Sequence, residues 1–303
     1  MKRDLRIIYM GTPEFAVPSL DILVDHGYNV VAVITAPDKP SGRGLKMNMS
    51  AVKEAALRHN IPVLQPEKLK NPEFLEELKS YNANLQIVVA FRMLPEAVWN
   101  MPELGTFNLH ASLLPQYRGA APINWAIING EKETGCTTFF LQHEIDTGDI
   151  ILQHKEEIKP SDNVGSLYER LMNKGSELVL ETVKQIEANN INQTPQNDAQ
   201  ELKSAPKIFR ETCKIDWTKT SEEIHNLVRG LSPYPVAWTE LQGKTCKIYA
   251  SKPNYSECKQ SVESDGKTYL RFKTSDGALD VLELQLEGKK RMKVDEFLRG
   301  FKL

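Results

Sequence analysis

The sequence predicts a two-part α/β protein, in which a doubly wound, mostly parallel sheet is followed by a small antiparallel β-barrel. Two observations predict this class. Short apolar runs alternate with helix-period segments through the first half of the chain, a pattern typical of a parallel sheet covered by helices on both faces. After a polar stretch, short strand-like segments separated by turn glycines follow, as in small barrels.

The first half contains the elements of a Rossmann-like domain in order. The apolar runs predict strands over residues 5–10, 29–34, 85–90 and 105–109. Helical periodicity predicts helices over residues 13–26, 50–59, 72–80 and 94–100. A helix over 120–129 and strands over 134–141 and 149–154 follow, the two strands being joined by a turn at Asp146-Thr147-Gly148. A long amphipathic helix over 163–187 closes this domain.

The Asn- and Gln-rich stretch 189–204 has almost nothing to bury, which indicates a linker. Beyond it, Thr220 and Glu223 form a capping box for a short helix that we expect Gly230 to end. Strands are predicted over 237–242, 247–250, 268–274 and 279–286, as in an OB-like barrel. We therefore expect a catalytic domain at 1–188, a linker at 189–207 and a β-barrel domain at 208–303.

Composition narrows the class of protein. The chain has 303 residues, of which 41% are hydrophobic and 26% charged, as in ordinary globular proteins. The apolar run near the N-terminus is too short for a signal-peptide core or a membrane span, so we expect a cytoplasmic protein that contacts no membrane. The four cysteines are scattered and predict neither a disulfide framework nor a zinc site.

Asn108 and His110 are candidate site residues because alternate residues of a strand face the same side. They lie at the carboxyl end of a predicted strand, where ligands bind in open parallel sheets. Asp146 follows a later strand and could lie against the same strand end. The alternative is structural: Asn108 caps a turn, His110 is a packed core histidine, and Asp146 is a turn aspartate.

Together these three side chains offer a carboxylate, an imidazole and an amide, a set suited to acyl transfer to an amine. No serine, Ser112 included, stands in a G-x-S-x-G nucleophile motif. We therefore expect direct attack by a substrate amine, with donors aimed at the oxyanion and no acyl-enzyme.

Several stretches of sequence now identify a family. Residues 107–115, 118–123 and 146–149 closely resemble the formyltetrahydrofolate-dependent formyltransferases. Four further segments match the branch that acts on methionyl initiator tRNA, and the similarity runs essentially end to end, through residues 287–292. These segments are residues 10–18, 37–44, 215–217 and 229–235.

The resemblance implies that Asn108, His110 and Asp146 are the catalytic set. The methionyl α-amine of initiator tRNA would attack the formyl carbon of 10-formyltetrahydrofolate. His110 and Asn108 would stabilise the tetrahedral oxyanion, while Asp146 orients His110 and assists amine deprotonation. The resemblance also implies a role in translation initiation and one-carbon metabolism. We expect a monomer.

The resemblance also implies the folate-binding residues. The folate-contacting segment would be Ser112, Leu113, Leu114 and Pro115, and the pterin would lie near Val89, Ala90, Phe91, Arg92 and Leu94. The chain departs from the family here. Phe91-Arg92-Met93 stands where the family usually has an aromatic residue, a glycine and one more residue before Leu-Pro.

Two basic segments are candidates for contact with tRNA. The loop 36–46 carries Lys39, Arg43 and Lys46, and the family resemblance implicates it in tRNA recognition. Lys289, Lys290 and Arg291 lie in a stretch with four positive charges in six residues, a plausible phosphate contact. Both segments also fit ordinary solvated surface loops.

Cofactors other than the formyl donor are not expected. The G-x-G-x-x-G pattern is absent, which argues against NAD. His143, Glu144, Asp146, Asp149 and His154 lack the spacing of metal ligands, so we expect no metal.

Two other functions remain open. One is a formyltransferase for a small amine, such as an amino sugar or a ribonucleotide precursor, against which the basic C-terminal barrel argues. The other is a non-catalytic RNA-binding protein, whose function would survive His110→Ala.

Overall fold

The computed structural model describes residues 2–41, 46–197 and 201–303, which form two compact units. The N-terminal unit comprises Met1–Arg118, Gly135–Glu156 and Glu169–Lys203. The C-terminal unit comprises Gly119–Thr134, Glu157–Tyr168 and Ser204–Leu303. Each unit is built from three separate stretches of the chain. The simpler division into a domain at 1–188, a linker at 189–207 and a domain at 208–303 stays a prediction.

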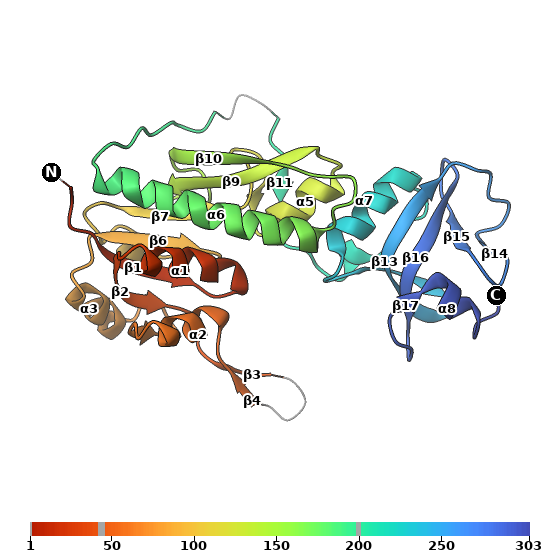
Figure 1. Ribbon diagram of the computed structural model, residues 1–303, viewed down its shortest axis with the longest axis horizontal. Coiled ribbons are helices and arrows are strands. Elements are labelled where there is room, and N and C mark those ends of the chain that lie inside the picture. The colour runs from red at the N-terminus through yellow and green to blue at the C-terminus, as the bar shows by residue number, and fades with distance from the viewer. Residues whose placement is uncertain (1, 42–45, 198–200) are drawn as a thin grey trace. The chain divides into compact units, whose positions relative to one another are not determined.

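A seven-stranded sheet forms the centre of the N-terminal unit, in the order β10-β9-β7-β6-β1-β2-β5 (Figure 1). Its strands are β1 Arg6–Gly11, β2 Asn29–Ile34, β5 Val63–Leu64, β6 Leu85–Val89, β7 Thr106–His110, β9 Glu133–Phe140 and β10 Ile150–Glu157. The first five of these are parallel to one another, whereas β9 runs antiparallel to β7. The chain reverses its direction of travel across the sheet after β5, so the doubly wound fold is confirmed.

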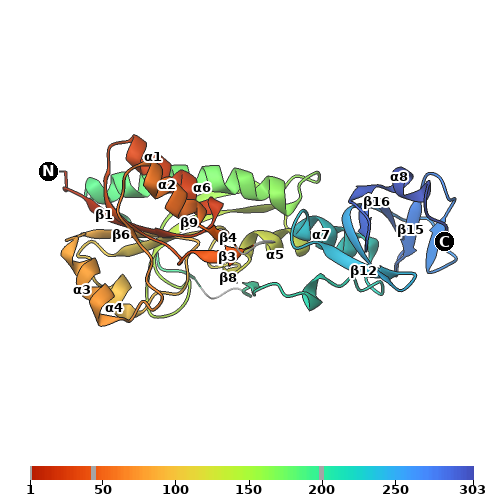
Figure 2. The same ribbon diagram turned by 90° about the horizontal axis from the view of Figure 1, so that it is seen from below.

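Helices cover both faces of this sheet, with α1, α2 and α6 on one face and α3 and α4 on the other (Figure 2). Their bounds are η1 Glu14–Ala16, α1 Val17–Asp25, α2 Ala51–Arg58, α3 Pro72–Ser80, α4 Glu96–Trp99 and α6 Val164–Glu187. Local capping explains two of the starts. The Ser50 side chain accepts from Lys53 N before α2, and Asn71 accepts from Glu73 N before α3.

The predicted basic loop forms a two-stranded hairpin, β3 Lys39–Ser41 and β4 Lys46–Asn48, which projects from the N-terminal unit (Figure 1). At its base the Asp38 carboxylate accepts from Lys53 Nζ at 2.5 Å and from Gln65 Nε2 at 2.8 Å. These hydrogen bonds, that of Lys53 first, hold the pKa of Asp38 below its usual value. The hairpin is therefore tied to α2 at its base.

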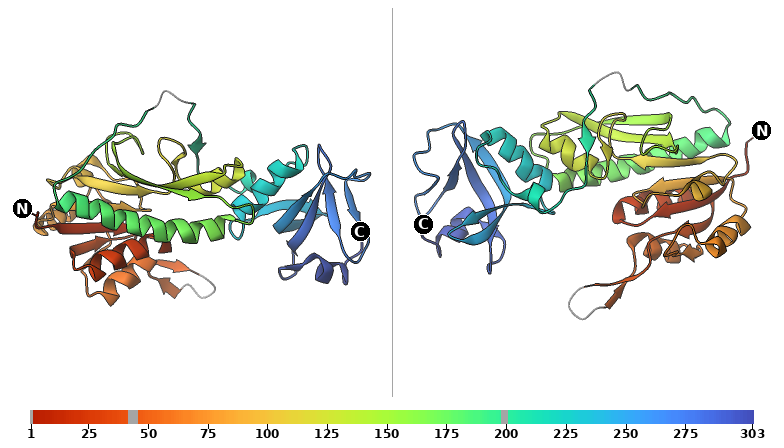
Figure 3. Two further views of the ribbon diagram at one scale, coloured as in Figure 1. Left: turned by 45° about the horizontal axis from the view of Figure 1, so that its top comes forward. Right: turned by 180° about the vertical axis from the view of Figure 1, so that it is seen from behind.

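The C-terminal unit is an antiparallel sheet curled into a half-barrel, which confirms the predicted barrel (Figure 3). Its strand order is β12-β13-β16-β15-β14, and β17 pairs with β16. The strands are β12 Ala237–Leu241, β13 Lys244–Asn254, β14 Val262–Ser264, β15 Leu270–Lys273, β16 Ala278–Leu286 and β17 Met292–Lys293. The helices are α5 Pro122–Ile128, η2 Glu211–Cys213, α7 Ser221–Leu231 and α8 Val294–Leu298. A separate short ladder joins β8 Arg118–Gly119 to β11 Ser204–Ala205.

The capping box of Thr220 and Glu223 is confirmed, but the prediction that Gly230 ends α7 is wrong. Gly230 lies inside the helix where α7 crosses α5. A Cβ there would be 2.6 Å from Ile128 Cγ1, and Asn124 Nδ2 donates to the Gly230 carbonyl at 2.8 Å. The glycine therefore permits close helix packing and does not terminate the helix.

Within the part of the chain that the structure describes, no helix combines the length and apolar character needed to span a membrane.

Candidate active site

Asn108 and His110 lie on the sheet face that carries α3 and α4. Asn108 is opposite Val88 in the β6–β7 ladder, and Val88 belongs to the core cluster packed under these helices. Leu109 points the other way and packs against Gly175 of α6. The alternation expected from the sequence therefore holds, and both polar side chains reach the end of β7 on one face.

Asp146 reaches this pair by a different route from the one predicted. Because β9 is antiparallel, it ends beside the start of β7, where Leu141 N donates to Thr106 O at 2.8 Å. Residues 141–149 then return along the sheet face. They bring Asp146 Oδ2 to 3.9 Å from His110 Nδ1.

The His110 ring is oriented by a main-chain carbonyl. Its side chain is almost fully buried, and Nε2 lies 2.8 Å from Tyr117 O. A carbonyl oxygen can only accept, so Nε2 carries the proton in this hydrogen bond. Nδ1 faces Asp146 across a distance too long for a direct hydrogen bond. The carboxylate is thus placed to stabilise a charged ring, while Tyr117 fixes the ring's direction.

The three loops around this strand end share an unusual backbone conformation. Ala90 after β6, Tyr117 in the loop after β7, and Asp146 have φ angles of 47°, 61° and 57°. This left-handed region is uncommon for residues other than glycine, and such residues concentrate at functional sites. Their clustering indicates that the loops are shaped for more than packing.

The segment predicted to contact folate is locked to β9. Ser112 is fully buried, its hydroxyl donates to Gln116 O at 2.7 Å, and its carbonyl accepts from Thr137 Oγ1 at 2.7 Å. Leu114 N donates to the same Thr137 hydroxyl at 3.2 Å, while Leu113 and Pro115 are half-buried. In this arrangement the Ser112 hydroxyl is not free to act as a nucleophile, in agreement with direct amine attack.

The residues predicted around the pterin end β6 and enter the next loop. Val89 and Leu94 are buried, Phe91 is half-buried, and Ala90 and Arg92 are exposed. The Arg92 guanidinium donates to the carbonyls of Pro66 and Glu67 and lies 5.7 Å from the centre of the Phe91 ring. The unusual arginine is therefore engaged with a neighbouring loop.

Family models account for most of this chain. A formyl transferase model matches residues 5–183, and a model of the formyl transferase C-terminal domain matches residues 207–302. The chain belongs to the formyltransferase family. The resemblance stated from the motifs is thereby confirmed.

Two relatives are similar over the whole chain. The methionyl-tRNA formyltransferase of Bacteroides fragilis is 57% identical over 313 residues, covering 100% of this chain and 97% of that protein. The methionyl-tRNA formyltransferase of Flavobacterium johnsoniae is 57% identical over 304 residues, covering 98% of this chain and 96% of that protein.

Solved structures share the fold at lower identity. The N-formyltransferase of Helicobacter canadensis, in complex with folinic acid and dTDP-3-aminofucose, has a TM-score of 0.69 and 24% identity, covering 91% of this chain and 98% of that chain. HypX of Aquifex aeolicus, in complex with tetrahydrofolic acid, has a TM-score of 0.66 and 20% identity, covering 99% of this chain and 48% of that chain. These two structures show the formyltransferase fold.

The predicted tRNA contacts of this formyltransferase divide into two sets. In the hairpin, Lys39 is exposed on β3, Lys46 begins β4, and Arg43 lies outside the described residues. In the C-terminal unit, Lys289 and Lys290 are exposed. Arg291 is exposed as well, but its guanidinium forms two hydrogen bonds to Glu283, at 2.8 and 2.6 Å. The charge of Arg291 is therefore largely compensated within the protein.

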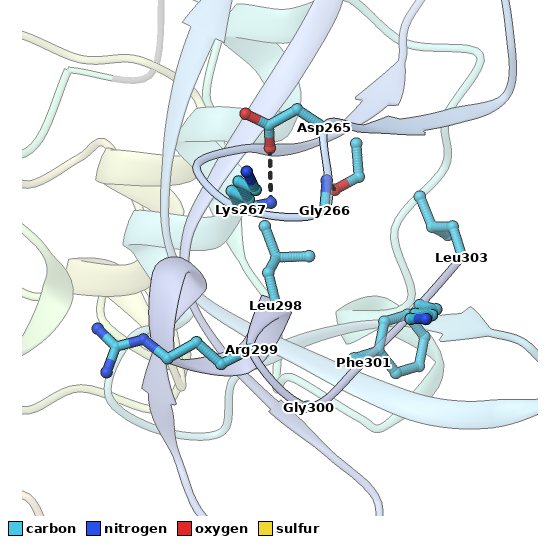
Figure 4. Close-up of a pocket in the computed structure, with 10 residues that line it drawn as sticks. Asp265, Gly266, Lys267, Leu298, Arg299, Gly300, Phe301 and Leu303 are labelled. Carbon is cyan, nitrogen blue, oxygen red and sulfur yellow. Dashed lines mark hydrogen bonds between the residues drawn. The ribbon is translucent and has the colours of Figure 1, made fainter.

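A surface pocket of about 1010 Å³ lies in the C-terminal unit, between residues 264–267 and 298–303 (Figure 4). Asp265 does not point at a ligand there, because its carboxylate accepts hydrogen bonds from the following turn, including one from Lys267 N at 2.9 Å. None of the described residues predicted for catalysis, folate or tRNA lines this pocket. The pocket is therefore not part of the candidate site at the end of β7.

The acidic and histidine side chains near the site are not grouped as metal ligands. His143 Nε2 lies 3.7 Å from Glu96, and His154 Nε2 lies 3.6 Å from Glu156. Among the described residues, no three His, Cys, Asp or Glu side chains are arranged to hold a metal ion.

Two parts of the site could not be predicted from the sequence. The Tyr117 carbonyl leaves no side-chain signal, because any residue has one. Gln196 lies in the stretch predicted as a linker, yet it contacts the Asp146 loop. The polar, Gln-rich sequence around it indicated a linker without contacts to the site.

Proposed function

We propose that this protein transfers the formyl group of 10-formyltetrahydrofolate to the α-amino group of methionyl initiator tRNA, in the cytoplasm and as a monomer. The observation that carries the proposal is the meeting of His110 and Asp146 at 3.9 Å beside Asn108, at the end of β7. It is supported by the full-length similarity to methionyl-tRNA formyltransferases.

The residues at this strand end fit a formyl donor. The Asn108 side chain is half-buried and makes no hydrogen bond within the described part of the chain, so its amide is available to a ligand. The exposed residues Ala90 and Arg92 would face the pterin ring system. The 112–115 segment would form a fixed wall beside it.

The reaction needs one bond made and one broken. The uncharged methionyl amine forms a bond to the formyl carbon, the bond from that carbon to N10 of the folate breaks, and one proton passes from the amine to N10. Asn108 donates from its amide to the oxygen as negative charge builds up. His110 in its charged form donates from Nδ1, because Nε2 is held by Tyr117.

Asp146 has two tasks in this scheme. Its carboxylate stabilises the charged ring of His110 across 3.9 Å, and it accepts the amine proton, which then passes to N10 of the folate. Each oxyanion donor contributes about 3 kcal/mol, so two donors together lower the barrier by about 6 kcal/mol, a rate factor of about 10⁴.

The test is formyl transfer by the purified protein. We would supply 10-formyltetrahydrofolate with initiator tRNA charged with labelled methionine, release the amino acid by mild base, and separate formylmethionine from methionine. Uncharged tRNA and an amino-sugar nucleotide serve as comparison acceptors. We expect formylmethionine.

Two results would overturn the proposal. Transfer to the amino sugar alone would show that the acceptor is a small amine. Binding of tRNA with no transfer to any acceptor would favour a non-catalytic RNA-binding protein.

A further inference from the structure

The stretch predicted as a linker makes hydrogen bonds to the Asp146 loop of the candidate site. Gln196 Nε2 donates to the carbonyls of Asp146 and Gly148, both at 2.8 Å. Its Oε1 accepts from Arg118, from Nε at 3.1 Å and from Nη2 at 2.7 Å. One carboxamide thus joins the Asp146 loop to the chain that follows β7.

We propose that Gln196 is a positioning residue of the formyl-transfer site, whose carboxamide holds the Asp146 loop so that the carboxylate stays beside His110. This proposal rests on the function proposed above. A glutamine suits the place because it offers donors and an acceptor at once. Both of its donor hydrogens and its oxygen are used, whereas a glutamate would keep only the bond to Arg118.

The Asp146 loop depends on such polar contacts because it buries little apolar surface. His143, Glu144 and Ile145 are exposed, and Ile145 shows 58% of its surface to solvent. Asp146 itself has a left-handed backbone, which costs free energy unless its surroundings hold it. The two hydrogen bonds from Gln196 supply this support on both sides of Thr147.

Gln196 is in turn fixed by its neighbours. Two residues earlier, Thr194 N donates to Ile150 O at 2.9 Å, and Thr194 O accepts from Ile150 N at 2.8 Å. Ile150 begins β10, so this bridge ties the segment to the sheet. The side chain of Gln196 therefore extends from a rigid point.

The same stretch of chain also supports the other side of the site. Tyr117 N donates to Lys203 O, and Lys203 N donates to Gln116 Oε1 at 2.9 Å. The Tyr117 carbonyl holds the His110 ring. Gln196 thus holds the Asp146 side of the His110–Asp146 pair, and Lys203 holds the Tyr117 side.

The first test compares Gln196→Glu and Gln196→Ala with Gln193→Ala, an exposed glutamine three residues earlier. We expect both Gln196 variants to lower kcat by about 10- to 100-fold, because small misplacements of reacting groups have effects of this size. The KM values for tRNA and formyl donor should change by less than about twofold, since Gln196 touches neither substrate. Gln193→Ala should match the wild type. Equal kcat in all four proteins would overturn the proposal.

A second test asks whether Gln196 acts through Asp146. In an Asp146→Asn background, Gln196→Ala should lower the remaining kcat by less than about threefold, because residues that act as one unit are not additive. A full additional 10- to 100-fold loss would show that Gln196 acts elsewhere.

A third readout needs no activity. Amide hydrogen exchange of residues 141–149 should become faster in Gln196→Ala, while that of β7 and β9 stays unchanged. Unchanged exchange in this loop would overturn the positioning role. If the wild type transfers no formyl group, the proposed function fails, and the exchange comparison still decides whether Gln196 holds the loop.

Discussion

Replacing Asn108 by alanine separates catalysis from stability in this protein. The Asn108 amide is half-buried and has no hydrogen-bond partner in the described part of the chain. Its removal leaves no protein group unsatisfied, so we expect the free energy of unfolding to change by only about 0.5 kcal/mol.

The effect on turnover should be much larger. If Asn108 donates to the oxyanion, its loss raises the barrier by about 2.7–4 kcal/mol, which is about 10²- to 10³-fold in kcat. The KM for tRNA should stay close to that of the wild type, because the lost bond forms mainly in the transition state.

His110→Ala should differ from Asn108→Ala in a measurable way. It removes both the group that faces Asp146 and the donor to the buried Tyr117 carbonyl. Depriving a buried carbonyl of its donor costs about 1–3 kcal/mol. This variant should therefore lose turnover and also unfold at a lower denaturant concentration.

Single-turnover formylation and urea unfolding, run on the same preparations, measure the two effects. Turnover by Asn108→Ala within about threefold of the wild type would refute the donor role, since it corresponds to less than 1 kcal/mol. Equal stability of His110→Ala and wild type would refute the structural role of the Tyr117 bond.

Three further predictions concern packing, pH and tRNA. Gly230→Ala should destabilise the C-terminal unit by about 1 kcal/mol in urea unfolding, because overpacking against Ile128 costs about 1–3 kcal/mol and the gain in helix propensity is only about 1 kcal/mol. The pKa of Asp38 is lowered by Lys53, so its contribution to stability is complete above the unfolded pKa of about 4 and is lost as the pH falls through the lower folded value. In acid unfolding, Asp38→Asn should lack this part of the pH dependence. Lys290→Ala should weaken tRNA binding and reduce the salt slope by about 1.

Each of these has a matched control. Ile128→Ala should remove the cost of Gly230→Ala, and a cost that persists would contradict the packing explanation. Parallel pH curves for wild type and Asp38→Asn would contradict the anchoring hydrogen bonds. Arg291→Ala should affect tRNA binding less than Lys290→Ala, because Glu283 already pairs with the arginine; the reverse order would contradict this reasoning.

The elements of the fold were largely visible in the sequence, because each depends on local pattern. The run Leu85–Val89 is entirely buried, as expected for a central parallel strand, and α3 covers Pro72–Ser80 as predicted. The direction of β9 was not visible, since an apolar strand buried on both faces looks the same in either orientation. The role of Gly230 was not visible for a related reason: a glycine in a helix marks an end or a close contact, and only the position of Ile128 decides which.

The side chains of the candidate site could be predicted from the sequence, but the groups that hold them in place could not. Asn108 and His110 followed from strand alternation, and the contact between Asp146 and His110 was anticipated, although its route was not. The Tyr117 carbonyl and the Gln196 carboxamide act through hydrogen bonds between a side chain and a main-chain carbonyl. Such bonds depend on how loops return in space, which local sequence does not specify.

The most direct measurement of the central claim is a crystal structure of the protein with a formyl-folate analogue. We predict that the formyl oxygen lies about 2.7–3.1 Å from Asn108 Nδ2 and faces His110. A formyl group bound away from Asn108 and His110, with the folate ordered elsewhere, would contradict it.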